Sequence, residues 1–178
     1  MKSYCLYQCL AGLVVMQPVN AAALESLPVA YHVVAKAYQV PVDILYAVAL
    51  TESGRRYDAS ALPWPWALNI EGRSVYCQSK SEALRHIHQA IQQQRSIDIG
   101  LMQISWRWQQ QRFTDAEQAL IPLQNLKAGA AILREQFENT QDWWQAVGRY
   151  HDPGQDPQSL ESAKHYRAKV RKNWTVAF

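Results

Sequence analysis

The sequence lacks several features that would each indicate a particular class of protein. Its 178 residues carry a net charge of only +3, too small an excess to indicate a nucleic-acid partner. No apolar run is long enough for a transmembrane helix. The chain shows no internal repeat, low-complexity tract or inter-domain linker. At 48% apolar and 19% charged residues, it has the composition of a single globular domain.

The sequence also has few cysteines and no clear metal-binding motif. Cys5 and Cys9 lie in a segment that we expect to be removed, which leaves Cys77 alone and predicts no internal disulfide. A lone cysteine without a histidine partner is more typical of a structural residue than of a nucleophile. His86 and His88 are two residues apart on an expected helix, so they point apart. No metal and no cofactor are therefore expected.

The first 23 residues have the pattern of a secretory signal peptide. Lys2 gives a weak positive start, residues 10–16 form a short apolar core, and small residues occupy 20–23. Cleavage after Ala23 would leave a single domain over 24–178, exported to the periplasm and without a stable membrane span. An uncleaved anchor is the alternative.

Helical patterns dominate the rest of the chain. The periodicity predicts helices over about 24–38, 42–53, 80–94, 122–137, 142–150 and 158–172. Ile91 and Leu123 are among the side chains expected to face inward. Residues 67–70 and 73–76 predict a hairpin with its turn at Glu71 and Gly72, and 95–100 predicts a loop. The expected fold is predominantly α, with a small β-hairpin or irregular insert.

Glu52 is an unusual carboxylate within this pattern. Leu45, Val48, Ala49 and Glu52 share one helix face by their spacing, so Glu52 points where the apolar side chains point. Burial and the negative end of the helix dipole both disfavour its ionised form, which predicts a raised pKa and suits a general acid. The alternative is a solvated Glu, or one paired with the adjacent Arg55 or Arg56.

Three motifs in order resemble a known family. Glu-Ser-Gly at 52–54 is followed by Gly-Leu-Met-Gln-Ile-Ser at 100–105 and Ala-Val-Gly-Arg-Tyr-His at 146–151. This order resembles the catalytic domain of lysozyme-like lytic transglycosylases, which cut the glycan strands of bacterial peptidoglycan, and the likeness covers about 27–153. It implies a lysozyme-like fold with a cleft.

The resemblance also implies roles for individual residues. Glu52 would be the sole catalytic acid and base, Gln103 would line the cleft beside the scissile bond, and Tyr150 would hydrogen-bond near Glu52. The residues expected to contact substrate are Asn69, Met102, Gln103, Ser105 and Tyr150. The sequence departs from the family at His151, where Asn is usual, and at Ser105, where many members carry Met. Ser60 is a candidate for a family serine that follows the catalytic Glu.

Two stretches resemble a narrower group of members. Ser-Ile-Asp-Ile before Gly100 and Pro-Trp-Pro-Trp-Ala-Leu-Asn-Ile at 63–70 are similar to members that accompany conjugation, type IV secretion and pilus assembly. Components of such a machine would then be partners, beside the peptidoglycan strands.

Other readings of the same residues stay open. Asp98 would hold a water in a hydrolytic muramidase, whereas as a loop former it would order the turn before Gly100. A non-catalytic wall-binding subunit is a third hypothesis. Arg149 would reach a substrate carboxylate or lie in solvent. The last expected helix carries five cations that would dock on wall or partner, or form a solvated face: Lys164, Arg167, Lys169, Arg171 and Lys172.

Overall fold

The computed structural model describes residues 20–57 and 60–178. Most of the predicted signal peptide lies outside this range, so cleavage after Ala23 stays a prediction. Within the described residues no single helix is long and apolar enough to cross a membrane, although α2 and α3, defined below, pass that test as a pair bent by 116°.

The predominantly α fold expected from the sequence is confirmed. Its helices are α1 (Ala21–Glu25), α2 (Val29–Tyr38), α3 (Val42–Ser53), α4 (Lys80–Gln92), α5 (Trp106–Gln109), α6 (Ala116–Leu120), α7 (Pro122–Thr140), α8 (Trp143–His151) and α9 (Pro157–Ala177). A 3₁₀ turn, Gln110–Arg112, follows α5. The helix expected over 24–38 is interrupted before Pro28, whose missing N–H and fixed φ suit the start of α2 rather than the interior of a longer helix.

The sheet is larger than the predicted hairpin. The hairpin of β3 (Ala67–Ile70) and β4 (Arg73–Tyr76) forms as expected, with Glu71 and Gly72 both at positive φ. The predicted loop over 95–100 instead contains β5 (Ile97–Ile99), which pairs with β3 and with β6 (Ile104–Ser105). A separate two-stranded hairpin of β1 (Gly54–Tyr57) and β2 (Ser60–Pro63) follows α3 directly. Strands this short carry too little alternation to be distinguished from loops in the sequence.

Polar side chains at the N-termini fix where several helices begin. Ser79 accepts a hydrogen bond from the Glu82 N–H at the start of α4, and the Glu82 carboxylate accepts one from the Gln78 N–H. Asp142 accepts from the backbone N–H groups of Trp144 and Gln145 at the start of α8.

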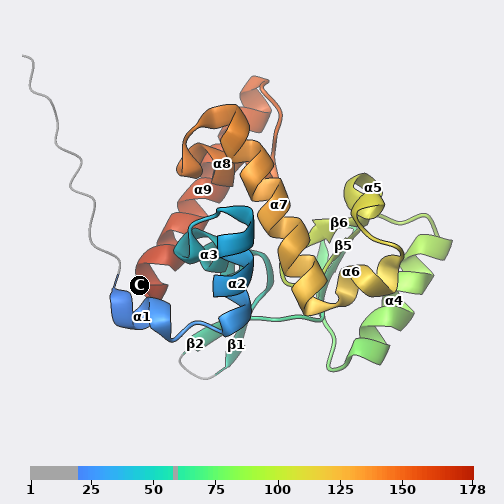
Figure 1. Cartoon of the computed structure of the whole chain (residues 1–178). Helices are drawn as coiled ribbons and strands as arrows, with labels where there is room; N and C mark the ends of the chain where they lie inside the picture. Colours follow the sequence, from blue (N-terminus) through green and yellow to red (C-terminus); the bar gives the residue numbers. More distant parts are fainter. Residues whose placement is uncertain (1–19, 58–59) are drawn as a thin grey trace, which may run out of the picture.

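The described residues form two hydrophobic cores. The larger is formed by α2, α3, α7, α8 and α9, and the smaller by the sheet with α4 and α6. Figure 1 shows α7 extending from α6, which belongs to the smaller core, towards α8. Two expected inward residues are corrected here: Ile91 is 37% exposed, because Ala90 faces the core instead, and Leu123 is 42% exposed.

Candidate active site

The end of α3 holds Glu52 at the boundary between the two cores. Leu45, Val48 and Ala49, which share its helix face, are completely buried. The next residue, Ser53, is also completely buried, and its hydroxyl donates to the Leu101 carbonyl at 2.8 Å. The Ser53 Oγ also accepts a hydrogen bond from the Trp64 N–H. Ser53 therefore ties the carboxyl end of α3 to the Gly100–Ser105 segment and keeps Glu52 facing it.

Burial is the main cause of the raised pKa of Glu52. The pKa of this carboxyl is raised from 4.5 to about 7, chiefly by burial and to a smaller extent by the charge of Asp98. A hydrogen bond from the Tyr166 hydroxyl opposes this shift, because it stabilises the carboxylate, and Lys169 acts in the same direction. The partner of Glu52 is thus a tyrosine of α9, and not the adjacent arginines that the alternative interpretation proposed.

Gly100 and Gln103 begin and end a tight turn opposite Glu52. Gly100 has φ +80°, and a Cβ at this position would lie 2.6 Å from the Asn125 side-chain nitrogen, so only glycine fits. Gln103 also has positive φ, and its side-chain amide donates to the carbonyls of Ala67 and Gly100 at 3.1 and 2.9 Å. With its N–H groups directed at the backbone, Gln103 retains its side-chain carbonyl as an acceptor for a ligand.

Asn125 of α7 stabilises the same turn through hydrogen bonds to the backbone. This completely buried amide accepts from the Met102 N–H at 2.8 Å and donates to the carbonyls of Ile99 and Ala119 at 2.7 and 2.8 Å. All three bonds go to backbone groups, so one side chain joins the turn, β5 and α6. Asn125 is not among the predicted site residues, because its only signal in the sequence is a polar residue beside the apolar face of a helix.

Asp98 joins two predicted contact residues across the sheet. Its carboxylate accepts from the Asn69 side-chain amide at 3.2 Å and from Ser105. Burial raises the pKa of Asp98, and these two hydrogen bonds oppose that shift. The Asn69 side-chain oxygen is buried and has no hydrogen-bond partner in the described part of the chain.

Tyr150 lies beside Glu52 without bonding to it. Its hydroxyl donates to the Met102 carbonyl at 2.7 Å, and both burial and the Glu52 charge raise its pKa. The expected contact of Met102 with substrate is wrong for its side chain, which is completely buried and packs against Gly129. Met102 instead supplies the carbonyl that holds Tyr150.

Tyr166, which donates to the Glu52 carboxylate, packs against His151. Their rings stack with centroids 4.6 Å apart and planes inclined by 4°. His151, where the family usually has Asn, therefore supports the residue that donates to Glu52. Tyr166 was missed in the sequence, where its only signal was its i, i+3, i+7 spacing with Ala163 and Val170 on the buried face of a basic helix.

A cavity of about 670 Å³ opens at these residues. Five of the six predicted residues contribute to its wall, namely Glu52, Asn69, Gln103, Ser105 and Tyr150. Asp98, His151 and Arg149 line it as well, together with Trp108, whose side chain is 67% exposed. The candidate Ser60 is exposed on β2 and is not part of this wall. The cavity combines one protonatable carboxyl, a second carboxylate, several amides and an exposed indole.

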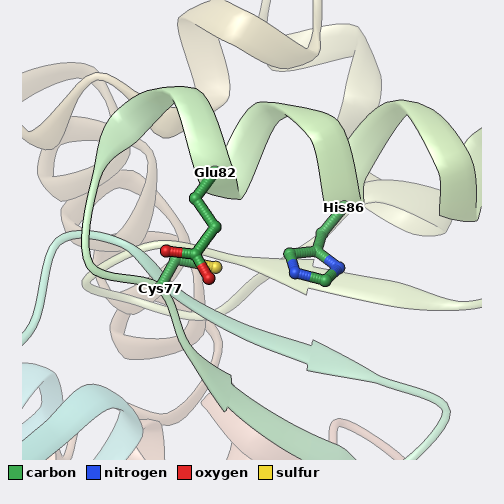
Figure 2. A group of neighbouring side chains, drawn as sticks. All are labelled: Cys77, Glu82 and His86. Carbon is green, nitrogen blue, oxygen red and sulfur yellow. The ribbon is translucent and has the colours of Figure 1, made fainter.

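A thiol, a carboxylate and an imidazole gather elsewhere, around the start of α4. Figure 2 shows Glu82 and His86 one turn apart on the helix, with Cys77 beneath Glu82. Their potential ligand atoms lie within 4.8 Å of one another, so the residue types and spacing suit a transition metal. Burial and the Glu82 charge raise the pKa of the Cys77 thiol, however, which disfavours the thiolate that a metal requires. None of the three residues lines the cavity at Glu52.

The family model described as Transglycosylase SLT domain matches residues 31–172. No curated protein and no solved structure matches the chain. The matched region contains all the residues placed around the cavity above.

Proposed function

The chain belongs to the family of transglycosylase SLT domains, lytic transglycosylases that act on peptidoglycan, and we propose that Glu52 is its only acid and base. In this proposal the enzyme cleaves the β-1,4 bond between N-acetylmuramic acid and N-acetylglucosamine. The product would carry a 1,6-anhydromuramoyl end.

The position of Glu52 in the cavity wall, with the Tyr166 hydroxyl hydrogen-bonded to its carboxylate, is the observation that carries this proposal. The pKa of Glu52 is raised to about 7, so both protonation states of the carboxyl are accessible near neutral pH and it suits both the donor and the acceptor role. Hydrolysis of a glycoside normally divides these tasks between two carboxylates. A single group with a pKa near neutrality performs both tasks in succession when the substrate supplies its own nucleophile.

In the first step the protonated Glu52 gives its proton to the oxygen that links the two sugars. The bond between this oxygen and muramoyl C1 breaks, N-acetylglucosamine leaves with a free hydroxyl, and C1 acquires oxocarbenium character. Glu52 is then a carboxylate, and the Tyr166 hydroxyl stabilises its new charge.

In the second step the carboxylate removes the proton from the muramoyl C6 hydroxyl. The C6 oxygen attacks C1 of the same sugar and closes the anhydro ring, and Glu52 is again protonated. No water is consumed. The attack is intramolecular, so the effective concentration of the nucleophile is high.

Other residues of the cavity would bind the sugars. The Gln103 side-chain carbonyl suits sugar hydroxyls and N-acetyl N–H groups, and Asn69 lines the same cavity. The exposed Trp108 ring suits the apolar face of a sugar.

Product analysis on purified peptidoglycan tests the proposal. Wild-type protein is expected to release muropeptides with anhydro ends, and Glu52→Gln is expected to release none while remaining folded by circular dichroism. Glu71→Gln is the matched control, because Glu71 is an exposed carboxylate that pairs with Arg95 away from the cavity. Anhydro products from the Glu52→Gln protein would contradict the proposal.

A hydrolytic muramidase is the second candidate, and the position of Asp98 in the same cavity favours it. In that case Asp98 would activate a water, and the products would have reducing muramic acid ends that are heavier by one water. Mass spectrometry separates the two candidates directly. A protein that releases no glycan at all would instead agree with the non-catalytic wall-binding hypothesis.

The cellular role belongs to the same proposal. We infer that the enzyme acts in the periplasm and opens the wall locally for a secretion, conjugation or pilus machine. The signal-peptide pattern and the two narrower resemblances support this. Each of the two resembling stretches contributes one residue to the cavity, Asn69 and Asp98, and these two side chains form a hydrogen bond with each other. Amino-terminal sequencing of exported protein should find Leu24 first. Deletion of the gene should reduce machine assembly, with recovery by wild type but not by Glu52→Gln.

A further inference from the structure

A second cavity, of about 590 Å³, lies between α8 and the first half of α9. Cavities of this size hold ligands of several hundred daltons. Polar and apolar groups share its wall, with the side chain of Gln145 on one side and that of Leu160, 57% exposed, on the other. The proposed acid–base step assigns no role to this cavity.

The wall of this cavity carries an excess of positive charge. Arg149, Lys164 and Arg167 line it, and Glu161 is the one acidic side chain among its described lining residues. Glu161 is already paired with Lys164 at 3.1 Å and with His165 at 2.9 Å. Among the ion pairs of the described residues, none involves Arg149 or Arg167. Neither guanidinium is thus neutralised by a carboxylate among the described residues, and guanidinium groups suit a ligand with carboxylates.

Arg149 connects this cavity with the one at Glu52, because it lines both. Its terminal nitrogen donates to the Pro153 carbonyl at 3.3 Å, and Pro153 belongs to the wall of the Glu52 cavity. The Arg149 Nε is buried and finds no acceptor among the described residues. Arg167 lines the second cavity together with Arg149, so a ligand that occupies both cavities would meet both guanidinium groups.

We propose that the second cavity binds the peptide stem of peptidoglycan through its carboxylates. This inference rests on the proposed function, in which a muramoyl residue occupies the cavity at Glu52. The stem is attached through the lactyl group on C3 of that sugar, two ring atoms from the reacting C1, so it must leave the catalytic cavity close to the scissile bond. Stem peptides combine free carboxylates with small alkyl side chains, which match the two guanidiniums and Leu160.

Binding of reaction products tests this inference without any cleavage. The two probes are the disaccharide of N-acetylglucosamine and anhydro-N-acetylmuramic acid, with and without a tetrapeptide stem, titrated into wild-type protein and followed by NMR. The stem is expected to raise the affinity. Arg167→Gln should weaken binding of the stem-bearing probe about tenfold, the loss typical of a charge-assisted hydrogen bond, and leave the bare disaccharide unchanged.

Two further variants control for charge and for folding. Lys172→Gln removes an exposed cation from the same helix outside the cavity, and should change neither affinity. Leu160→Asp places a carboxylate at an exposed position of the wall, and should weaken only the stem-bearing probe. In the wild-type protein, amidation of the stem carboxylates should weaken binding of the stem-bearing probe by as much as Arg167→Gln does.

Equal affinity of wild-type protein for the two probes would overturn the inference, as would an equal loss for both probes in Arg167→Gln. Neither result depends on how the glycan is cut. The proposed function fails separately, if wild-type protein releases no anhydro products from whole peptidoglycan.

Discussion

The hydroxyl of Tyr166 donates a hydrogen bond to the carboxylate of Glu52, across 114 residues of sequence. Tyr166 is itself buried, and it stacks on His151. The bond is one of two effects that lower the pKa of Glu52 against the larger effect of burial. It therefore sets how readily Glu52 gives up and recovers its proton.

Tyr166→Phe should raise the pKa of Glu52 above about 7, since it removes a donor that stabilises the carboxylate. One hydrogen bond to a charged group corresponds to about one pKa unit or more. In the proposed mechanism, the pH profile of anhydromuropeptide release should move upward by that amount, and kcat should fall. Tyr38→Phe, a half-buried tyrosine outside the cavity, is the control and should leave the profile in place. An unshifted profile in Tyr166→Phe would contradict the role of this bond.

Glu52→Gln should stabilise the protein at alkaline pH. The folded-state pKa of Glu52 is raised from 4.5 to about 7, so the unfolded chain loses this proton first as the pH rises. The stability due to the protonated group is complete below pH 4.5 and is lost as the pH rises to about 7 and beyond. The variant should match wild type near pH 4 and exceed it by about 3 kcal/mol at pH 8 in urea unfolding. A stability difference that does not change with pH would be inconsistent with a raised pKa.

Asn125→Ala should lower both stability and activity. The change leaves the Met102 N–H and the carbonyls of Ile99 and Ala119 without their buried partner, at a cost of about 3 kcal/mol. It also frees the turn that carries Gln103, so kcat should fall even at temperatures where the variant is folded. Asn139→Ala is the matched control on α7, because Asn139 is exposed and bonds only within its own helix. Equal losses in the two variants would argue against a special role for Asn125.

Trp108→Ala should weaken substrate binding with little effect on folding. Its side chain is 67% exposed, so its removal leaves no void in either core. In steady-state assays on glycan strands KM should rise several-fold, within the range of about 0.5–1.5 kcal/mol typical of aromatic contacts, while Tm stays within about 2 °C of wild type. An unchanged KM would remove Trp108 from the set of sugar contacts.

The local pattern of the sequence predicts the helices and the catalytic candidate well. Apolar spacing places Glu52 on the buried face of its helix, and Ser79, Glu82 and Asp142 mark where two helices begin. These features depend on residues within one or two turns of each other, so they are visible in the linear order. The strand β5 was expected as a loop, because three residues are too few to show alternation, and it forms only when β3 and β6 pair with it.

The residues that the sequence did not identify act over long distances. Asn125 bonds to backbone groups up to 26 residues away, and Tyr166 reaches Glu52 from the far end of the chain. A hydrogen bond between distant segments leaves no periodic pattern in the sequence. The only signal for either residue is therefore its place on a helix face. Met102 was misassigned for a related reason: its motif adjoins the cavity, but its side chain turns into the core.

The helical class, the apolar setting of Glu52 and the order of three motifs that resemble one family can all be read from the linear sequence. Each follows from short-range spacing or from residue identity. The groups that surround the carboxylate depend on the folded arrangement, because burial and hydrogen bonding involve segments that meet through folding. The pKa of about 7 that suits Glu52 to the proposed chemistry is a product of that assembly.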